Sequence, residues 1–173
     1  MPEACYSSTN AVKSIVMGIE IERKFLLAND DWRRLATGVS YRQGYLSRDK
    51  GRIVRLRTVK DKGYLTIKGE VKGLTRIEYE YEIPKQDCIE MLAMVEKLTE
   101  KSIIEKERYI IEHRGFAWEI DEFSGENQGL IIAEIELDFE EQKFEKPGWV
   151  GKEVTDDPRY FNSNLINHPY TKW

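Results

Sequence analysis

The chain has 173 residues, the size of one domain that can bury a core without disulfides or zinc. Charged residues make up 34% of the sequence, yet the net formal charge is only −4, so the placement of the charges matters more than their sum. This balance disfavours a basic protein that wraps polyanions. The 11% aromatic content and the five prolines disfavour an intrinsically disordered chain.

The two cysteines, Cys5 and Cys88, form neither a zinc-binding pattern nor a disulfide framework, which fits a reducing cytoplasmic environment. No apolar run approaches the roughly 20 residues that a membrane span requires. The N-terminus also lacks the apolar stretch of a secretory signal. We interpret residues 1–16 as a polar extension and residues 17–173 as a single domain.

Alternation of apolar and polar residues with period two dominates the chain from Ile19 onward, and this pattern is typical of strands. Short turn signals such as Asp61-Lys62-Gly63 and Arg114-Gly115 favour antiparallel hairpins. We predict eight strands, over residues 18–27, 40–47, 52–60, 63–70, 75–83, 103–113, 116–123 and 130–139.

A few stretches break the alternation. Residues 85–99 place apolar side chains on one helical face after Pro84, and residues 29–35 fit a short helix. Beyond Phe139 we expect an irregular tail with short helical pieces around 140–145 and 158–166. Eight strands with few helices predict a mainly β fold, an eight-stranded antiparallel closed barrel with a few flanking helices.

Nearly every predicted strand has one ionic and one mostly apolar face. The simplest interpretation is that the ionic faces meet solvent. However, like charges are grouped in pairs on one face, although such pairs repel. The acidic pairs are Glu20 with Glu22 and Glu134 with Glu136, and the basic pairs are Arg55 with Arg57 and Lys106 with Arg108.

A strongly anionic ligand that carries a divalent metal would explain this sorting. Carboxylate pairs bind hard cations such as Mg²⁺, and Arg and Lys bind phosphate oxygens. If the ionic faces point into a barrel, the apolar faces point outward. We then expect the helices and the tail to cover those outer faces, and we expect Trp118, Tyr79 and Tyr81 to be buried beneath them.

The sequence Glu20-Ile21-Glu22-Arg23-Lys24 resembles the ExExK strand that opens proteins of the CYTH superfamily, the triphosphate tunnel metalloenzymes. The resemblance runs from Met17 to about Tyr170 and is closest to the compact bacterial branch. Its further motifs are RQGYL at 42–46, RLR at 55–57, TIKG at 66–69, RIEYE at 76–80, EKERY at 105–109, WEIDEF at 118–123, AEIEL at 133–137 and GKEVTDDPRYFNSNL at 151–165.

This resemblance implies an eight-stranded antiparallel barrel with a charged tunnel. It also implies activity on a linear triphosphate with Mg²⁺ or Mn²⁺, at two metal sites. Family members hydrolyse inorganic triphosphate, thiamine triphosphate, or nucleoside and RNA 5′-triphosphates, and one branch cyclises ATP. Nothing in the sequence suggests a pocket for a nucleotide base or a thiazolium ring.

The resemblance also assigns roles to residues. The implied substrate-binding set is Lys24, Arg55, Arg57, Lys68, Arg76, Lys106, Arg108 and Lys152. The implied metal ligands are Glu20, Glu22, Asp121, Glu134 and Glu136, of which Glu20 and Glu22 would position the attacking water. The catalytic candidates are Glu20, Glu22, Lys106 and Tyr45.

Other interpretations stay open for some of these residues. Arg76, Glu78 and Glu119 are equally consistent with internal ion pairing, since an unpaired inward charge is costly. Glu78 and Glu80 are expected to orient the basic residues. Tyr45 is either core packing or a proton acceptor beside a lysine. His113 and His168 show no ligand spacing and receive no role.

The leading hypothesis is metal-dependent hydrolysis of inorganic triphosphate to pyrophosphate and phosphate. Alternatives on the same fold are a class IV-type adenylate cyclase and a thiamine or nucleoside triphosphatase. A non-catalytic polyphosphate-binding protein is a third class, against which the complete acidic set argues. We expect a small anionic substrate, no nucleic acid and no membrane partner, and a homodimer is compatible with the sequence.

Overall fold

The computed structural model describes residues 19–49, 51–98 and 103–173, so the extension predicted over 1–16 lies outside the described residues. Within these ranges the chain forms nine strands in one sheet. They are β1 (Glu20–Leu27), β2 (Val39–Asp49), β3 (Arg52–Val59), β4 (Lys62–Lys72), β5 (Thr75–Ile83), β6 (Ile103–His113), β7 (Phe116–Phe123), β8 (Ile131–Glu136) and β9 (Val150–Glu153). The predicted mainly β fold is confirmed, and β9 is the strand that the sequence did not predict.

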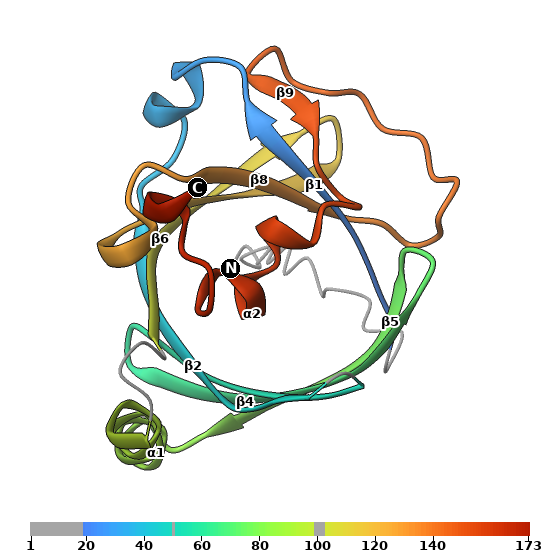
Figure 1. Ribbon diagram of the computed structural model, residues 1–173. Coiled ribbons are helices and arrows are strands. Elements are labelled where there is room, and N and C mark those ends of the chain that lie inside the picture. Colours follow the sequence, from blue (N-terminus) through green and yellow to red (C-terminus); the bar gives the residue numbers. More distant parts are fainter. Residues whose placement is uncertain (1–18, 50, 99–102) are drawn as a thin grey trace, which may run out of the picture.

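The strands β1 to β8 close a ring. The sheet order is β5-β4-β3-β2-β6-β7-β8-β1-β9, and a further pairing joins β5 to β1. This closing pair places Glu20 opposite Arg76, and farther along the same edge of β1, Phe25 lies opposite Glu153 of β9. All these pairings are antiparallel, as the hairpin-length turns predict, and Figure 1 looks into the ring.

The helix α1 (Lys85–Leu98) covers part of the outer face of the ring, as Figure 1 shows. Its residues Cys88, Leu92 and Val95 pack with Leu56 of β3 in one hydrophobic cluster. Burying each such side chain contributes roughly 1.5–3 kcal/mol to folding. The helix predicted over 85–99 is thus confirmed as far as Leu98, and its last predicted residue lies outside the described ranges.

A second apolar cluster covers the outer face of β1, β7 and β8. Phe25 and Trp118 point outward there and are fully buried. Trp32 of the short helix η1 (Asp31–Arg34) packs on the same cluster, which confirms the short helix expected over 29–35. Residues 140–145, all of them described, form a loop instead of the predicted helical piece. Phe144 anchors that loop, with its ring centroid 5.8 Å from that of Trp118.

The C-terminal segment enters the ring instead of covering its outside. Its elements are η3 (Pro158–Tyr160), α2 (Asn162–Leu165) and η4 (Tyr170–Lys172), and Figure 1 shows them within the outline of the strands. Tyr160 and Leu165 pack with Ile104 and Phe123, which point inward. Our expectation that the tail covers the outside is therefore confirmed for Phe144 and Trp149, which pack on the outer cluster, and wrong for residues 158–172, which fill the apolar interior at one end of the ring.

The outer face of β5 lacks the expected cover. Tyr79 and Tyr81 are 46% and 55% exposed, so the prediction that they are buried is wrong, whereas that for Trp118 is confirmed. The cause is geometric: α1 contacts β2, β3 and β4 but starts just after β5 ends. None of the helices in the described part of the chain is long and apolar enough to cross a membrane.

Candidate active site

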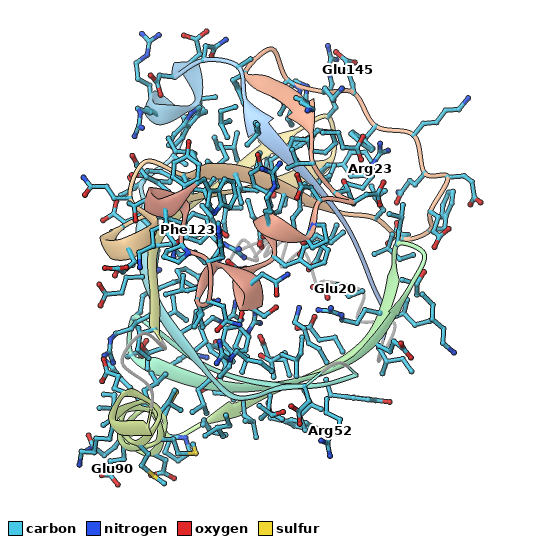
Figure 2. The ribbon with its side chains drawn as sticks, viewed as in Figure 1. Glu20, Arg23, Arg52, Glu90, Phe123 and Glu145 are labelled. Atoms are coloured by element: carbon cyan, nitrogen blue, oxygen red, sulfur yellow. The ribbon has the colours of Figure 1, made fainter. Side chains whose placement is uncertain are left out.

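The ring encloses a cavity of about 370 Å³ that is lined by the inward-facing residues of the strands. Figure 2 shows Glu20 inside the ring and Glu90 of α1 outside it. The ionic faces therefore point inward, and the interpretation that they meet bulk solvent is wrong. The predicted site residues that line the cavity are Glu20, Glu22, Lys24, Tyr45, Arg55, Arg57, Lys68, Arg76, Arg108, Glu134 and Glu136.

On the wall formed by β3, β4 and β5, Glu80 holds two arginines together. Arg57 Nη2 donates to both carboxylate oxygens of Glu80, at 2.8 and 2.9 Å. Arg55 Nη2 lies 3.3 Å from Glu80 Oε2 and 3.1 Å from Thr66 Oγ1. Burial alone would raise the pKa of Glu80, but Arg57 and the other donors hold it below its usual value. Glu80 therefore stays ionised and orients these guanidinium groups.

Lys68 on the same wall is shared by two carboxylates. Its Nζ lies 2.9 Å from each carboxylate oxygen of Glu20 and 2.6 Å from Glu78 Oε2. Burial, with the neighbouring charge of Glu20, raises the pKa of Glu78 to about 7. At Glu20, burial acts to raise the pKa, but the charge and hydrogen bonds of Lys68, the hydrogen bond with Glu78 and the charge of Lys24 together outweigh it and lower the pKa to about 2. Near neutral pH, Glu20 is thus ionised and Glu78 is partly protonated.

The β3–β5 wall also holds donors without acceptors. In the described part of the chain, the Nε atoms of Arg55, Arg57 and Arg76 are buried and have no hydrogen-bond partner. A buried unsatisfied donor costs roughly 1–3 kcal/mol. All three arginines line the cavity, and guanidinium groups match phosphate oxygens in geometry and charge. The arrangement fits an anionic ligand with several phosphate groups.

The opposite wall, formed by β1, β6, β7 and β8, has its charges paired within the protein. Arg108 donates from Nε to Asp121 Oδ1 and from Nη2 to Asp121 Oδ2, both at 2.6 Å, and from Nη2 to Glu134 Oε2 at 2.9 Å. Lys24 Nζ lies 2.5 Å from Glu134 Oε1 and also contacts Glu22. Asp121 is fully buried. Folding alone therefore assembles this wall.

Lys106 belongs to the same network and has an altered basicity. Its side chain donates to Asp121, and its Nζ lies 5.5 Å from the ring centroid of Phe123. Burial and the nearby charge of Arg108 lower the pKa of Lys106 to about 8, although Asp121 opposes this shift. A lysine with this pKa can exchange a proton near neutral pH.

Carboxylates on β1 and β8 face one another across the strand pair. Glu22 lies opposite Glu136, and Lys24 lies opposite Glu134. No group of three acidic, Cys or His side chains in the described ranges is arranged to hold a metal ion by itself. Mg²⁺ usually keeps few protein carboxylates and completes its coordination with water and phosphate oxygens. The residues present therefore fit a cation that is bound jointly with a phosphate ligand.

Three predicted residues lie off the cavity lining. Lys106 and Asp121 are buried beside it and pair with each other. Asp121 also pairs with Arg108, so a metal at Asp121 would have to displace both basic groups. Lys152 is exposed on β9 and is not among the described residues that line the cavity. The structure does not bring Lys152 together with the other predicted substrate-binding residues.

Tyr45 contacts both the cavity and the apolar interior. It lines the cavity and also packs in the cluster with Ile53. Gln43 Nε2 lies 3.2 Å from the Tyr45 hydroxyl oxygen. Burial raises the pKa of Tyr45 above its usual value, although Arg55 and Lys68 oppose the shift. The phenol is therefore protonated near neutral pH and can donate a hydrogen bond.

The sequence did not predict the contribution of the C-terminal segment to the cavity. The lining includes Thr155, Asp156, Phe161, Asn162 and Ser163. The available signal was apolar residues at inward positions near one end of several strands, such as Ile53, Ile104 and Ile132. These positions needed an apolar partner inside the ring.

Comparison with known proteins decides the family. The CYTH domain profile matches residues 18–170. The chain belongs to the CYTH domain family. The resemblance inferred from the ExExK strand and its accompanying motifs is thereby confirmed, and the closed ring of antiparallel strands is the fold that the resemblance implies.

Individual proteins are also similar to this chain over most of its length. The chain is 56% identical over 154 residues to an inorganic triphosphatase of Acetivibrio thermocellus, a match that covers 89% of this chain and 97% of that protein. It is 39% identical over 150 residues to an inorganic triphosphatase of Nitrosomonas europaea, covering 84% and 95%. The crystal structure of the inorganic triphosphatase NE1496 superimposes with a TM-score of 0.61 at 34% identity, covering 85% of this chain and 93% of that chain.

Proposed function

We propose that this protein hydrolyses inorganic triphosphate to pyrophosphate and phosphate in the cavity of the ring. The observation that carries the proposal is the set of three buried guanidinium Nε donors without acceptors, on Arg55, Arg57 and Arg76. These three arginines line one cavity together with acidic and basic residues of the opposite wall. Two relatives that span most of the chain are inorganic triphosphatases, which supports the same substrate.

The β3–β5 wall would bind the phosphates. Arg55 and Arg57 are held in place by Glu80, and Arg76 adds a third guanidinium. Fixed donors of this kind position a phosphoryl group and stabilise the charge that its transfer develops, and phosphoryl transfer depends mainly on these two effects.

Glu20, Glu22, Glu134 and Glu136 would hold Mg²⁺ or Mn²⁺ jointly with the substrate, and two sites are expected from the two acidic pairs. When bound, such a cation neutralises phosphate charge and assists the attack of water. Lys24 contacts Glu22 and Glu134, and it would keep these carboxylates oriented when no cation is bound.

Lys106 is buried beside the cavity and paired with Asp121, so it would receive the proton of the attacking water through an intervening group and not by direct contact. Its pKa of about 8 leaves part of the population as the neutral amine, which can accept a proton. Tyr45, protonated and on the lining, would donate a hydrogen bond to a phosphate oxygen. Water adds its oxygen to one phosphorus while the bond from that phosphorus to the bridging oxygen breaks. The bridging oxygen leaves on the other product, and the proton lost by the water passes to the basic group.

A substrate panel tests the proposal. Purified protein with Mg²⁺ or Mn²⁺ is given inorganic triphosphate, ATP and thiamine triphosphate, and the products are identified by phosphorus NMR. We expect pyrophosphate and phosphate from inorganic triphosphate at the highest kcat/KM. Faster phosphate release from ATP or thiamine triphosphate would contradict the substrate, cyclic AMP would indicate a cyclase, and tight binding without turnover would indicate a non-catalytic binding protein.

A further inference from the structure

One end of the cavity is closed by the C-terminal segment. Tyr45 and Ile53 line the cavity and also belong to the apolar cluster that contains Tyr160, Leu165 and Ile166. The cavity and this cluster therefore share a boundary inside the ring. We call this boundary, formed by residues 160–166 with Tyr45 and Ile53, the floor of the cavity.

Two polar side chains of the floor face the cavity. Asn162 and Ser163 lie between the buried anchors Tyr160 and Leu165, and both line the cavity. The Asn162 Oδ1 atom is buried and has no hydrogen-bond partner within the described part of the chain. A buried polar atom without a partner calls for an explanation, and a phosphate in the cavity would supply a partner once the carboxamide rotates to present its donating nitrogen.

The segment that carries these residues is held in place independently of a ligand. The backbone N–H groups of Asn164 and Leu165 donate to the carbonyl oxygen of Phe161, at 2.8 and 3.1 Å. Asn164 Nδ2 donates to the carbonyl oxygen of Pro158 at 2.8 Å. With Leu165 fully buried, the positions of Asn162 and Ser163 are fixed before binding, which lowers the cost of ordering them.

We propose that Asn162 and Ser163 are specificity-determining residues that bind an unsubstituted terminal phosphate at the floor. This inference rests on the proposed function, because it assigns one end of the triphosphate. A carboxamide and a hydroxyl are neutral donors, and rotation of the Asn162 carboxamide exchanges its oxygen for the donating nitrogen. The arginines and lysines of the walls supply the positive charge, and the floor supplies hydrogen bonds to the terminal phosphate of the triphosphate.

The closed floor predicts which triphosphates are rejected. Tyr160, Leu165 and Ile166 of the floor are buried in the apolar cluster that fills this end of the ring, so a group attached to the innermost phosphate would have to displace them. Compounds with one free end, such as inorganic triphosphate or ATP, can place that end at the floor. A triphosphate that is substituted at both ends cannot.

An isosteric substitution tests the floor. Asn162→Asp keeps the side-chain shape and adds a negative charge, so it should raise the KM for inorganic triphosphate, and the metal-free Kd measured by calorimetry in EDTA, at least tenfold. Ser163→Ala should raise both about threefold. The matched control is Asn167→Asp, which adds the same charge in the same segment at an exposed residue whose Oδ1 accepts from Arg48. The control should behave as the wild type, and thermal unfolding confirms that each variant is folded.

The second arm uses diadenosine triphosphate, which has no free phosphate end. We expect ATP to compete with inorganic triphosphate for the wild-type protein and diadenosine triphosphate to leave binding unchanged at the same concentration. Equal competition by the two nucleotides, or an Asn162→Asp variant with wild-type Kd and KM, would overturn the floor assignment. If the wild type binds inorganic triphosphate without hydrolysing it, the proposed function fails, while the binding measurements still decide the floor.

Discussion

The two walls of the cavity both carry inward charges, but they hold them differently. On the β1 and β6–β8 wall, Arg108 is bonded to Asp121 and Glu134, and Lys24 is bonded to Glu134. On the β3–β5 wall, Glu80 holds Arg55 and Arg57 through their Nη2 atoms. The Nε donors of Arg55, Arg57 and Arg76 remain without partners within the described part of the chain.

This difference separates two tasks. The β1 and β6–β8 wall pairs its buried charges when the protein folds. Its ion pairs therefore contribute to the stability of the protein and fix the positions of the acidic residues. The β3–β5 wall keeps three arginines whose Nε donors have no partner among the described residues, so it has hydrogen-bonding capacity left for a ligand and should supply affinity. Substitutions in one wall should therefore affect stability and turnover differently from substitutions in the other wall.

The largest expected effect is on stability. Arg108→Ala removes the guanidinium that bonds both Asp121 and Glu134, two buried carboxylates, and should lower the free energy of unfolding by about 3–5 kcal/mol. Arg76→Ala removes a side chain whose Nε has no partner among the described residues, and should cost less than about 1 kcal/mol. Urea unfolding measures both values. Equal losses would contradict the division between the walls.

Turnover should depend strongly on the acidic pairs. Glu22→Gln keeps the side-chain volume but removes charge where the cation is proposed to bind, and should lower kcat at least a hundredfold, which is about 2.7 kcal/mol. Metal-free triphosphate binding should change less than threefold. The control is Glu82→Gln, whose exposed carboxylate pairs with Lys62 at 2.7 Å. Turnover of Glu22→Gln within tenfold of the wild type would refute the role of this pair.

Affinity should depend on the guanidinium shape of Arg76. Arg76→Lys keeps the positive charge but removes the Nε donor and the planar fork. We expect the KM for triphosphate to rise about tenfold, with kcat within twofold of the wild type. Steady-state kinetics measures both constants, and an unchanged KM would show that charge alone is sufficient at this position.

The smallest expected effect is on pH dependence. Lys106 accepts a proton only as the neutral amine, and with a pKa of about 8 its neutral fraction rises with pH. We expect kcat/KM to increase about threefold between pH 7.5 and 8.5 and to level off above that range. Lys106→Arg should lower activity and lose this inflection, since arginine does not deprotonate there. A variant that keeps the inflection would assign it to another group.

The sequence predicted the walls of the cavity well because strand alternation fixes which residues share a face. The inward orientation of the like-charge pairs predicts that Glu20, Glu22, Arg55 and Arg57 lie together, and all four line the cavity. The helix over residues 85–98 could be predicted equally well from the sequence, because its apolar residues recur with helical spacing.

The C-terminal segment could not be predicted in the same way. Its position depends on long-range packing of Leu165 and Ile166 against inward residues such as Ile104, which local periodicity does not encode. Lys152 illustrates the same limit: its motif placed it with the substrate-binding set, but β9 pairs with β1 so that this side chain is exposed. Asn162 and Ser163 were missed because the segment was expected outside the ring.

Arginine side-chain NMR tests the division between the walls most directly. Inorganic triphosphate is titrated into the protein in EDTA, and the Nε–H resonances of the cavity arginines are followed. We predict large shifts for Arg55, Arg57 and Arg76, whose Nε donors have no partner among the described residues, and little change for Arg108, whose Nε already donates to Asp121 at 2.6 Å. Shifts at Arg108 alone, or none at all on saturation, would contradict the account.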